Sequence, residues 1–193
     1  MKEDKMLEEV NKANDIMRSG GIILYPTDTI WGIGCDATND EAVKKIFKLK
    51  KRQDSKSMIV LLDNSGKLES YVQNVPETAW TFIEFSERPT TIIYDNARNL
   101  ADSAIAEDGS IAIRITKDEF CKKLIGKLRK PIISTSANIS DEKSPTNFNE
   151  ISKAILNGVD YIVNLRQDEK NSEARPSTII RLSSNGQIKF IRK

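Results

Sequence analysis

Residues 131–140 of the chain read PIISTSANIS. Two isoleucines after Pro131 lead directly into Ser134, Thr135, Ser136, Ala137 and Asn138. β-Branched residues favour a buried strand, whereas a buried polar group without a hydrogen-bond partner costs roughly 1–3 kcal/mol. The stretch therefore predicts a strand that leaves the core at a place where its polar side chains find partners.

Apolar strands and amphipathic helices alternate on both sides of this stretch. The expected strands are 20–26, 30–37, 58–62, 90–94, 110–115, 131–135, 161–163, 177–182 and 187–191. The expected helices carry apolar faces at Leu7/Val10/Ala13/Met17, Val43/Ile46/Phe47, Trp80/Ile83, Phe120/Leu124/Leu128 and Phe148/Ile151/Ile155. Alternation of this kind predicts an α/β protein, and the closing hairpin around Ser184-Asn185-Gly186 favours a mixed sheet over a purely parallel one.

Local signals mark where several of these elements begin and end. Gly20 and Gly21 end the first helix, and Asn39 or Asp40 caps the second. Gly32 and Gly34 interrupt a strand, which indicates a bulge or the close approach of another group. Residues 166–174, RQDEKNSEA, are mostly polar and are expected to form either a mobile flap or an ordinary surface loop.

The bulk composition excludes several kinds of chemistry. The 193 residues suit one domain, predicted to span 1–193, and the net charge of +2 does not by itself indicate a nucleic-acid or membrane partner. The chain contains no histidine, so Ser-His-Asp and Cys-His catalysis and histidine-ligated metals are excluded. Any chemistry must rely on hydroxyls, carboxylates, cations and backbone groups.

The cysteines and the first residues bear on the compartment. Cys35 and Cys121 lie far apart in the sequence without metal-ligand spacing, which fits a reducing environment and argues against a zinc site. The first ten residues are rich in charge, and no apolar stretch is long enough for a signal peptide or a membrane span. A cytoplasmic protein is expected.

Four polar segments each adjoin an apolar strand: residues 26–29 (PTDT), 48–56 (KLKKRQDSK), 134–138 (STSAN) and 175–178 (RPST). Ligands in open α/β sheets collect at strand ends, so these segments could converge on one site. Each also has an ordinary structural interpretation. PTDT suits a proline turn in which Asp28 caps its own backbone, and STSAN suits a hydroxyl turn capped by Asn138.

Basic and hydroxyl side chains point to an anionic ligand. Lys48 and Arg52 share a helical face while Lys50 projects elsewhere, although cations at a helix end also occur simply because they favour its dipole. The chain has neither a GxxxxGK[ST] nor a GxGxxG motif, so STSAN could replace a glycine loop by letting backbone N–H groups approach phosphate oxygens. Arg114 stands in an apolar strand and would grip a carboxylate or phosphate if it faces a cleft.

Taken in order, GGIILYPTDTIWGIGCDA, KLKKR with MIVLL, SIAIRI, PIISTSANIS with KSPT, and RPSTII resemble the YrdC/TsaC family of threonylcarbamoyl-AMP synthases. The resemblance covers about Gly20 to Arg192. It implies a single-domain twisted mixed β-sheet with helices around a concave basic cavity. The chain looks like the short form of the family, with the catalytic domain alone.

The resemblance also implies a reaction and its residues. ATP, L-threonine and bicarbonate would give L-threonylcarbamoyladenylate and pyrophosphate, and a partner enzyme complex would then modify tRNA. The residues that resemble the threonine-binding set are Thr27, Arg114, Ser134 and Ser177. Those that resemble the ATP-binding set are Lys50, Arg52, Ser110, Ser136, Asn138, Ser144 and Arg192.

Of the ATP-binding set, Lys50 and Arg52 are expected to face the phosphates and to assist catalysis. The carbamate formed from threonine and bicarbonate would attack the α-phosphorus, which requires alignment and charge stabilisation but no covalent enzyme intermediate. Mg²⁺ is expected to bridge the phosphates, held by ATP and water, because the sequence offers no clear protein ligand.

The chain departs from the family pattern at Lys56-Ser57-Met58, at FSERPTT and at Arg181, where aspartate is frequent. YPTDT and STSAN are intact, so these departures bear on loop shape. The alternative function is a non-catalytic module of the same fold that binds tRNA or double-stranded RNA. Its RNA affinity would fall steeply with salt and would not require threonine.

Overall fold

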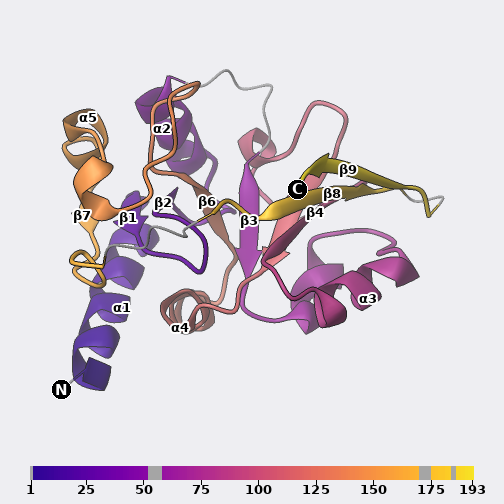
Figure 1. The fold of residues 1–193 in the computed structure, drawn as a ribbon, viewed down its shortest axis with the longest axis horizontal. Helices are drawn as coiled ribbons and strands as arrows, with labels where there is room; N and C mark the ends of the chain where they lie inside the picture. The colour runs from indigo at the N-terminus through magenta and orange to yellow at the C-terminus, as the bar shows by residue number, and fades with distance from the viewer. Residues whose placement is uncertain (1, 52–57, 170–174, 184–185) are drawn as a thin grey trace.

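The computed structural model describes residues 2–51, 58–169, 175–183 and 186–193. Within these residues the strands form one sheet in the order β7-β1-β2-β6-β3-β5-β4-β8-β9 (Figure 1). The strands are β1 (Ile23–Tyr25), β2 (Gly32–Gly34), β3 (Ile59–Leu62), β4 (Thr90–Tyr94), β5 (Ile111–Ile115), β6 (Ile132–Ser136), β7 (Tyr161–Ile162), β8 (Thr178–Leu182) and β9 (Ile188–Arg192). Parallel pairs such as β3–β5 and β4–β8 adjoin antiparallel ones, so the predicted twisted mixed α/β sheet is confirmed.

Helices lie on both faces of this sheet. They are α1 (Lys2–Arg18), α2 (Asp40–Lys50), α3 (Glu77–Phe85), α4 (Glu119–Leu128) and α5 (Lys153–Leu156), with short 3₁₀ turns η1 (Ser65–Ser70), η2 (Asp102–Ala104) and η3 (Phe148–Glu150). Helices α1 and α4 lie beside each other, and α2 lies across the sheet from them (Figure 1). The arrangement follows from the alternating strand pattern, which gives each face of the sheet its own apolar side chains.

The two faces build two separate apolar cores. Val43, Ile46 and Phe47 of α2 pack with Ile33 and Ile113 on one face. On the other face, α1 and α4 pack over the β1, β6 and β3 region, and the buried side chains there include Val10, Met17, Leu61, Phe120, Leu124 and Ile132. Farther along this second face, Ala112 of β5, Ile93 of β4 and Ile179 of β8 line a cavity.

Strands β2 and β6 approach each other closely at Gly34. A Cβ atom placed on Gly34 would lie 2.3 Å from the carbonyl oxygen of Ile133 and 2.7 Å from Cε1 of Tyr25. No side chain fits between these groups. The interruption of this strand by glycine is therefore the close approach that the sequence indicates, and it fixes the start of STSAN beside PTDT.

Most of the predicted helix boundaries agree with the structure. The Asn39 side chain caps α2 by accepting from the backbone N–H of Ala42, and Gly20 follows α1 with φ +79°. The predicted helix through Phe148, Ile151 and Ile155 is wrong as a single element. Ile151 and Ser152 have extended backbone conformations and divide the expected helix into η3 and α5. Ile155 belongs to the short helix α5, which places its side chain in the core.

Two predicted features fall partly outside the described residues. The strands of the final hairpin pair as expected, but Ser184 and Asn185 of its turn are not described. Residues 170–174 of the proposed flap are not described either, and the preceding part is attached by Arg166. The Arg166 guanidinium lies 2.7 Å from Oδ2 of Asp118 and donates to the carbonyl oxygens of Pro26 and Thr27.

Candidate active site

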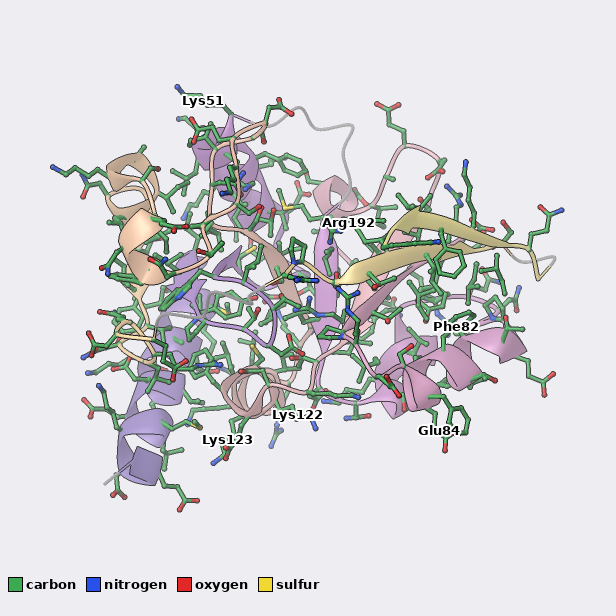
Figure 2. All side chains as sticks on the ribbon, viewed as in Figure 1. Lys51, Phe82, Glu84, Lys122, Lys123 and Arg192 are labelled. Carbon is green, nitrogen blue, oxygen red and sulfur yellow. The ribbon has the colours of Figure 1, made fainter. Side chains whose placement is uncertain are left out.

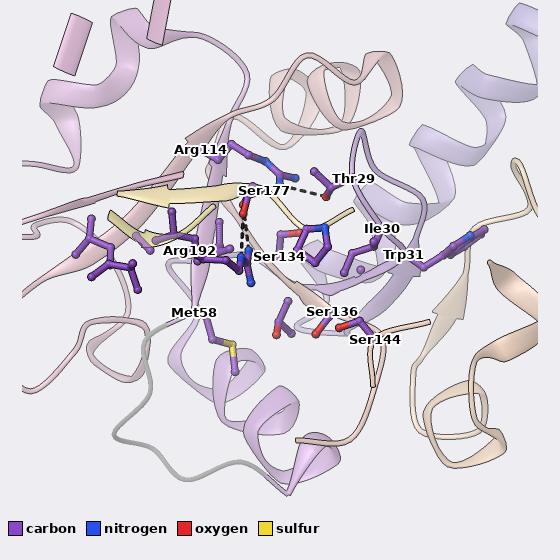
Figure 3. A pocket seen from close by; sticks show the side chains of 18 residues that line it. Thr29, Ile30, Trp31, Met58, Arg114, Ser134, Ser136, Ser144, Ser177 and Arg192 are labelled. Carbon is purple, nitrogen blue, oxygen red and sulfur yellow. Dashed lines mark hydrogen bonds between the residues drawn. The ribbon is translucent and has the colours of Figure 1, made fainter. Parts of the chain in front are cut away.

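A cavity of about 230 Å³ opens on the α1/α4 face of the sheet, where strands β6, β3, β5, β4 and β8 continue beyond these two helices. It brings together three of the four polar segments: the lining includes Thr29 of PTDT, Ser134, Thr135 and Ser136 of STSAN, and Ser177 of RPST. Arg114 and Arg192 are its charged lining residues, and Figure 3 shows both pointing inward. The polar strand ends therefore converge as the sequence predicts.

Strand alternation explains which side chains enter this cavity. Ile111 and Ile113 of β5 face the α2 core, so Ala112 and Arg114 face the opposite side. Ile59 of β3 is paired in register with both Ala112 and Ser134, and all three line the cavity. Arg114 thus enters the site by regular pleating, without any special turn.

Arg114 is 3% exposed and is held by two residues of PTDT. Its Nη2 lies 3.0 Å from Oδ1 of Asp28, and its Nη1 donates to Oγ1 of Thr29 at 3.2 Å. The Nε atom of Arg114 is buried and has no hydrogen-bond partner among the described residues. A buried guanidinium with an unpaired N–H suits a carboxylate or phosphate ligand.

The PTDT turn is capped by Thr27. Its Oγ1 accepts from the backbone N–H of Thr29 at 3.0 Å and donates to the carbonyl oxygen of Ile30 at 2.7 Å. The interpretation in which Asp28 caps its own turn is wrong, because Oδ2 of Asp28 accepts from the N–H of Lys117 and from Thr116. Thr27 lines a small neighbouring cavity with Arg166 and Thr29, so Thr29 is the PTDT hydroxyl that reaches the main cavity.

Ser177 and Arg192 form the opposite wall. The Ser177 hydroxyl is 2.8 Å from that of buried Thr91, and Arg192 donates from Nε to the Ser177 carbonyl oxygen at 2.9 Å. Strand β9 bulges here, since Ile179 pairs with Arg192 and Ile180 with Phe190. A bulge leaves one residue unpaired and bends its strand, and both Ile191 and Arg192 line the cavity.

The electrostatics of the cavity favour an anion. Burial, followed by the positive charge of Arg114, lowers the pKa of Arg192. Asp28 contacts Arg114 but does not line the cavity, and among the described lining residues there is no carboxylate. Two guanidinium groups therefore share a partly buried site whose remaining polar groups are mostly hydroxyls, and a bound anion would reduce their mutual repulsion.

STSAN contributes hydroxyl groups and not its later backbone amides. Ser134 and Ser136 line the cavity, but the N–H of Ala137 donates to the carbonyl of Trp31 and that of Asn138 to the carbonyl of Ser136. These two N–H groups are therefore already paired within the protein. Asn138 does not line the cavity, and its side-chain amide caps the following turn by donating to the carbonyls of Ile139 and Glu142, as its structural interpretation predicted.

Lys50 lies beneath this turn. It is 1% exposed, and its Nζ donates to the carbonyl oxygens of Ser136 and Asn138, each at 2.5 Å. In return, the N–H of Ser140 donates to the Lys50 carbonyl. Lys50 is not among the residues that line the cavity, so its visible role is to hold the STSAN turn.

The other residues of the basic cluster were predicted from helical spacing, which placed Lys48 and Arg52 on one face of a helix. Helix α2 ends at Lys50, and Lys51 adopts φ 50° as its left-handed cap. Arg52 lies outside the described residues. Lys48 lines another cavity, of about 670 Å³ between α2 and α5, and Lys51 projects at the edge of the molecule, away from Arg192 (Figure 2).

Ser110 and Ser144 take different positions. Ser144 lines the cavity next to Ser136 (Figure 3). Ser110 is 4% exposed and does not line it, and its hydroxyl donates to Oδ1 of Asp108 at 2.6 Å. Asp108 in turn pairs with Arg181 at 3.0 Å, so the unusual arginine at position 181 supports the turn before β5.

Three further residues of the site were missed by the sequence interpretation. Thr29 binds Arg114, Asp28 pairs with it, and Thr91 holds Ser177. Thr29 and Asp28 belong to PTDT, a segment that the sequence interpretation had already assigned to the site. The presence of a second threonine two residues after Thr27 could therefore have indicated Thr29 as a further site residue. Thr91 had no such signal, because a threonine within an apolar strand is ordinary.

The described residues give no indication of a metal centre or a membrane span. No group of three or more Asp, Glu, Cys or His side chains among them could hold a metal ion. No helix within the described ranges is long and apolar enough to cross a bilayer. Both cysteines are buried as free thiols, and burial raises the pKa of each.

The fold and the cavity define an α/β protein with a cationic, hydroxyl-lined pocket for a small anionic ligand. The Sua5/YciO/YrdC family model, described as "Telomere recombination", matches residues 15–193. The chain belongs to this family. That match covers all the elements that build the cavity.

Two relatives with named activities support the assignment of the chain to this family. A protein of Pseudoalteromonas translucida named threonylcarbamoyl-AMP synthase is 31% identical over 176 residues, covering 89% of this chain and 91% of the relative. A protein of Methanocaldococcus jannaschii that carries the same name as a provisional assignment is 33% identical, with 94% and 82% covered. The chain is therefore similar over most of its length to two proteins that are named for this activity.

A solved structure that contains a named ligand has the same fold as this chain. The structure of P. abyssi Sua5 complexed with L-threonine superimposes with a TM-score of 0.81 at 26% identity, covering 90% of this chain. The chain spans about half the length of that protein, since the match covers 50% of it. The shared half contains the α/β fold described above.

Proposed function

We propose that this chain is a threonylcarbamoyl-AMP synthase that joins L-threonine, bicarbonate and ATP and releases pyrophosphate. The observation that carries the proposal is the cavity itself, in which Arg114 and Arg192 share one pocket with hydroxyl groups from three separate segments. The two relatives named for this activity and the threonine complex of P. abyssi Sua5 support the choice of substrates. We also propose that residues 1–193 act as one domain.

Threonine would bind at the Arg114 end of the cavity. Its carboxylate would meet the Nε edge of Arg114, which is buried and unpaired among the described residues. Ser134 and Ser177 would bond its amino and hydroxyl groups, and the fact that both line the same pocket supports this assignment. Thr27 would contribute to threonine binding indirectly, because its hydroxyl accepts from the backbone N–H of Thr29 and so orders the turn that carries Thr29.

ATP would occupy the other end. In Figure 3, Ser136 and Ser144 lie together at the side opposite Arg114 and Thr29, with Arg192 between the two groups. We assign Ser136, Ser144 and Arg192 to direct nucleotide contact. Ser110 and Asn138 would shape this end through the turns that they hold.

Lys50 and Arg52 are proposed to serve the phosphates by different routes. The Lys50 ammonium fixes the carbonyls of Ser136 and Asn138, so it would set the position of the Ser136 hydroxyl and add positive potential behind it. Arg52 lies outside the described residues and is proposed to contact the phosphates themselves.

The reaction needs positioning and charge stabilisation. The threonine amine and bicarbonate lose water to form a carbamate, whose oxygen attacks the α-phosphorus of ATP as the bond to pyrophosphate breaks. Charge accumulates on the phosphoryl oxygens and on the leaving pyrophosphate, and cationic donors such as Arg192 stabilise it. No histidine or protein nucleophile is required, in keeping with the composition.

The described residues do not fit a resident Mg²⁺ ion. They contain no cluster of metal-ligand side chains, and no carboxylate among them lines the cavity. We therefore propose Mg²⁺ only as a companion of ATP, coordinated by its phosphates and by water. The product, a reactive mixed anhydride, would pass to a tRNA-modifying transferase complex.

The test is pyrophosphate release by the purified chain with each substrate omitted in turn. We expect release that requires both threonine and bicarbonate, and that D-threonine does not support. Release without threonine, or no release with all three substrates present, would contradict the proposal.

A non-catalytic RNA-binding module remains the rival to exclude. It predicts RNA affinity that falls steeply with salt and is indifferent to threonine. RNA binding of this kind, with no threonine-dependent pyrophosphate release, would favour the rival.

A further inference from the structure

Asp28 is the carboxylate that faces Arg114, and it belongs to neither predicted ligand set. Its side chain is 14% exposed, compared with 4% for that of Arg114, and the closest atoms, Oδ1 and Nη2, are 3.0 Å apart. The two oxygens have different partners. Oδ1 meets Arg114, whereas Oδ2 accepts from the backbone N–H of Lys117 at 3.1 Å and from the hydroxyl of Thr116 at 3.4 Å.

These contacts fix the carboxylate at the end of β5, the strand that carries Arg114. Thr116 and Lys117 directly follow that strand, so PTDT is attached to the same segment whose arginine it holds. Thr29 adds a second contact, to Nη1 of Arg114. Adjacent residues of one turn therefore hold both terminal nitrogens of the guanidinium.

The third nitrogen of the Arg114 guanidinium, Nε, is not held by the PTDT turn. The Nε atom has no hydrogen-bond partner among the described residues, and Arg114 lines the cavity while Asp28 does not. Asp28 holds Nη2 by an ion pair without hydrogen-bond geometry, whereas Nη1 donates a hydrogen bond to Thr29. Because a guanidinium is planar, restraining these two nitrogens restricts the direction of the third. Asp28 also balances the charge of a buried cation that lies close to Arg192.

We propose that Asp28 is a positioning residue for amino-acid recognition: together with Thr29 it orients Arg114 so that its Nε edge selects a substrate carboxylate. This rests on the proposed function, because the substrate it names is threonine. Asp28 touches no reacting atom in this account, and it is neither a general base nor a metal ligand.

Two effects of removing Asp28 oppose each other. Loss of its negative charge would reduce repulsion of an incoming carboxylate, whereas loss of its contacts would release the guanidinium and the PTDT turn. Asp28→Asn loses the charge but keeps one oxygen acceptor, and Asp28→Ala loses both. If orientation dominates, the alanine variant is the more impaired of the two.

The experiment compares L-threonine with L-threoninamide, which lacks the carboxylate charge. Calorimetric binding is measured for the unmodified chain, Asp28→Asn, Asp28→Ala and Asp36→Asn. Asp36 is the matched control, because it is also an aspartate paired with a cation, Lys130, at 2.7 Å, and it does not line the cavity. Thermal unfolding of each variant establishes that it is folded.

We expect Asp28→Ala to weaken threonine binding about tenfold or more and to reduce the preference for threonine over the amide, with a smaller effect in Asp28→Asn. ATP KM should change less than about twofold in all variants, and Asp36→Asn should keep the full preference. A loss of stability alone would not change the ratio of the affinities for the two ligands.

The inference is overturned if folded Asp28→Ala retains the original ratio of affinities. If the alanine variant is unfolded, the same result for Asp28→Asn overturns it. If the unmodified chain itself binds no threonine, the proposed function fails first, and the two failures are thereby distinguished.

Discussion

At the residue scale, the site depends on side chains that act in pairs. Arg114 is held by Asp28 and Thr29, Arg192 donates to Ser177, and Ser177 contacts Thr91. Sequence interpretation found Arg114, Arg192 and Ser177, because a strand arginine or a clustered hydroxyl is conspicuous, but it did not assign Asp28, Thr29 or Thr91 to the site. The partners were missed, since a contact such as that between residues 91 and 177 depends on which strands become neighbours.

The two arginines should have separable kinetic effects. We predict that Arg114→Lys raises the threonine KM by about tenfold or more, because lysine keeps the charge but cannot form the planar pair of bonds to a carboxylate. Arg192→Lys should instead raise mainly the ATP KM. Steady-state pyrophosphate release, measured with each substrate varied in turn, gives both constants. Equal effects of Arg114→Lys on both substrates would contradict the assigned division of the cavity.

Lys50 should contribute to stability even when no nucleotide is added. Lys50→Met removes the donor to two carbonyl oxygens, and we expect a loss of about 2–4 kcal/mol in the free energy of unfolding. Lys48→Met is the control on the same helix, because Lys48 is exposed, and it should change stability by less than about 0.5 kcal/mol. Urea denaturation of both variants measures this. Unchanged stability in Lys50→Met would show that the lysine does not hold the turn.

At the element scale, the closeness of β2 to β6 determines where STSAN begins relative to PTDT. Gly34→Ala would place a methyl group 2.3 Å from the Ile133 carbonyl, and we expect a loss of at least about 2 kcal/mol of stability. Gly126→Ala in α4 is the matched control. Apart from its chain neighbours and the backbone of its own helix, no described atom lies within 4 Å of its added Cβ, so alanine should be neutral or stabilise by up to about 1 kcal/mol. Similar unfolding midpoints for the two variants would refute the role given to Gly34.

The N-terminus of α2 is attached to η2 by Asp40. Its pKa is lowered to about 2, first by the hydrogen bond from Lys44 and then by that from the Ser103 N–H. A lowered folded-state pKa means that the carboxylate stabilises the fold above its ordinary pKa near 3.8 and loses this effect as the pH falls towards 2. Asp40→Asn should therefore be less stable than the unmodified chain at pH 6, and the difference should shrink by pH 2. A constant difference across this range would exclude the linkage.

Elements were more predictable than their arrangement. Apolar runs such as 58–62 and 110–115 identified β3 and β5, because the pattern of each is local. The helix expected through Phe148, Ile151 and Ile155 was wrong, since three apolar residues at helical spacing can also be buried by two short turns. The order of strands in the sheet, which brings β6 between β2 and β3, had no local signal.

At the scale of the whole molecule, the cavity lies where the face that carries α1 and α4 extends beyond them. The sheet continues through β5, β4 and β8, and residues from several distant segments line the pocket there. The guanidinium groups of Arg114 and Arg192 line the pocket, while Asp28, which pairs with Arg114, is not among its described lining residues. This distribution supports two anionic substrates side by side: the carboxylate of threonine and the phosphates of ATP.

The most direct test of the account is the identity of the product. The purified chain is incubated with ATP, L-threonine and ¹³C-bicarbonate, and the quenched reaction is examined by mass spectrometry. We predict an adenylate that contains threonine and one ¹³C atom, formed together with pyrophosphate. A threonyl adenylate without the labelled carbon, or no threonine-containing adenylate at all, would contradict the central claim.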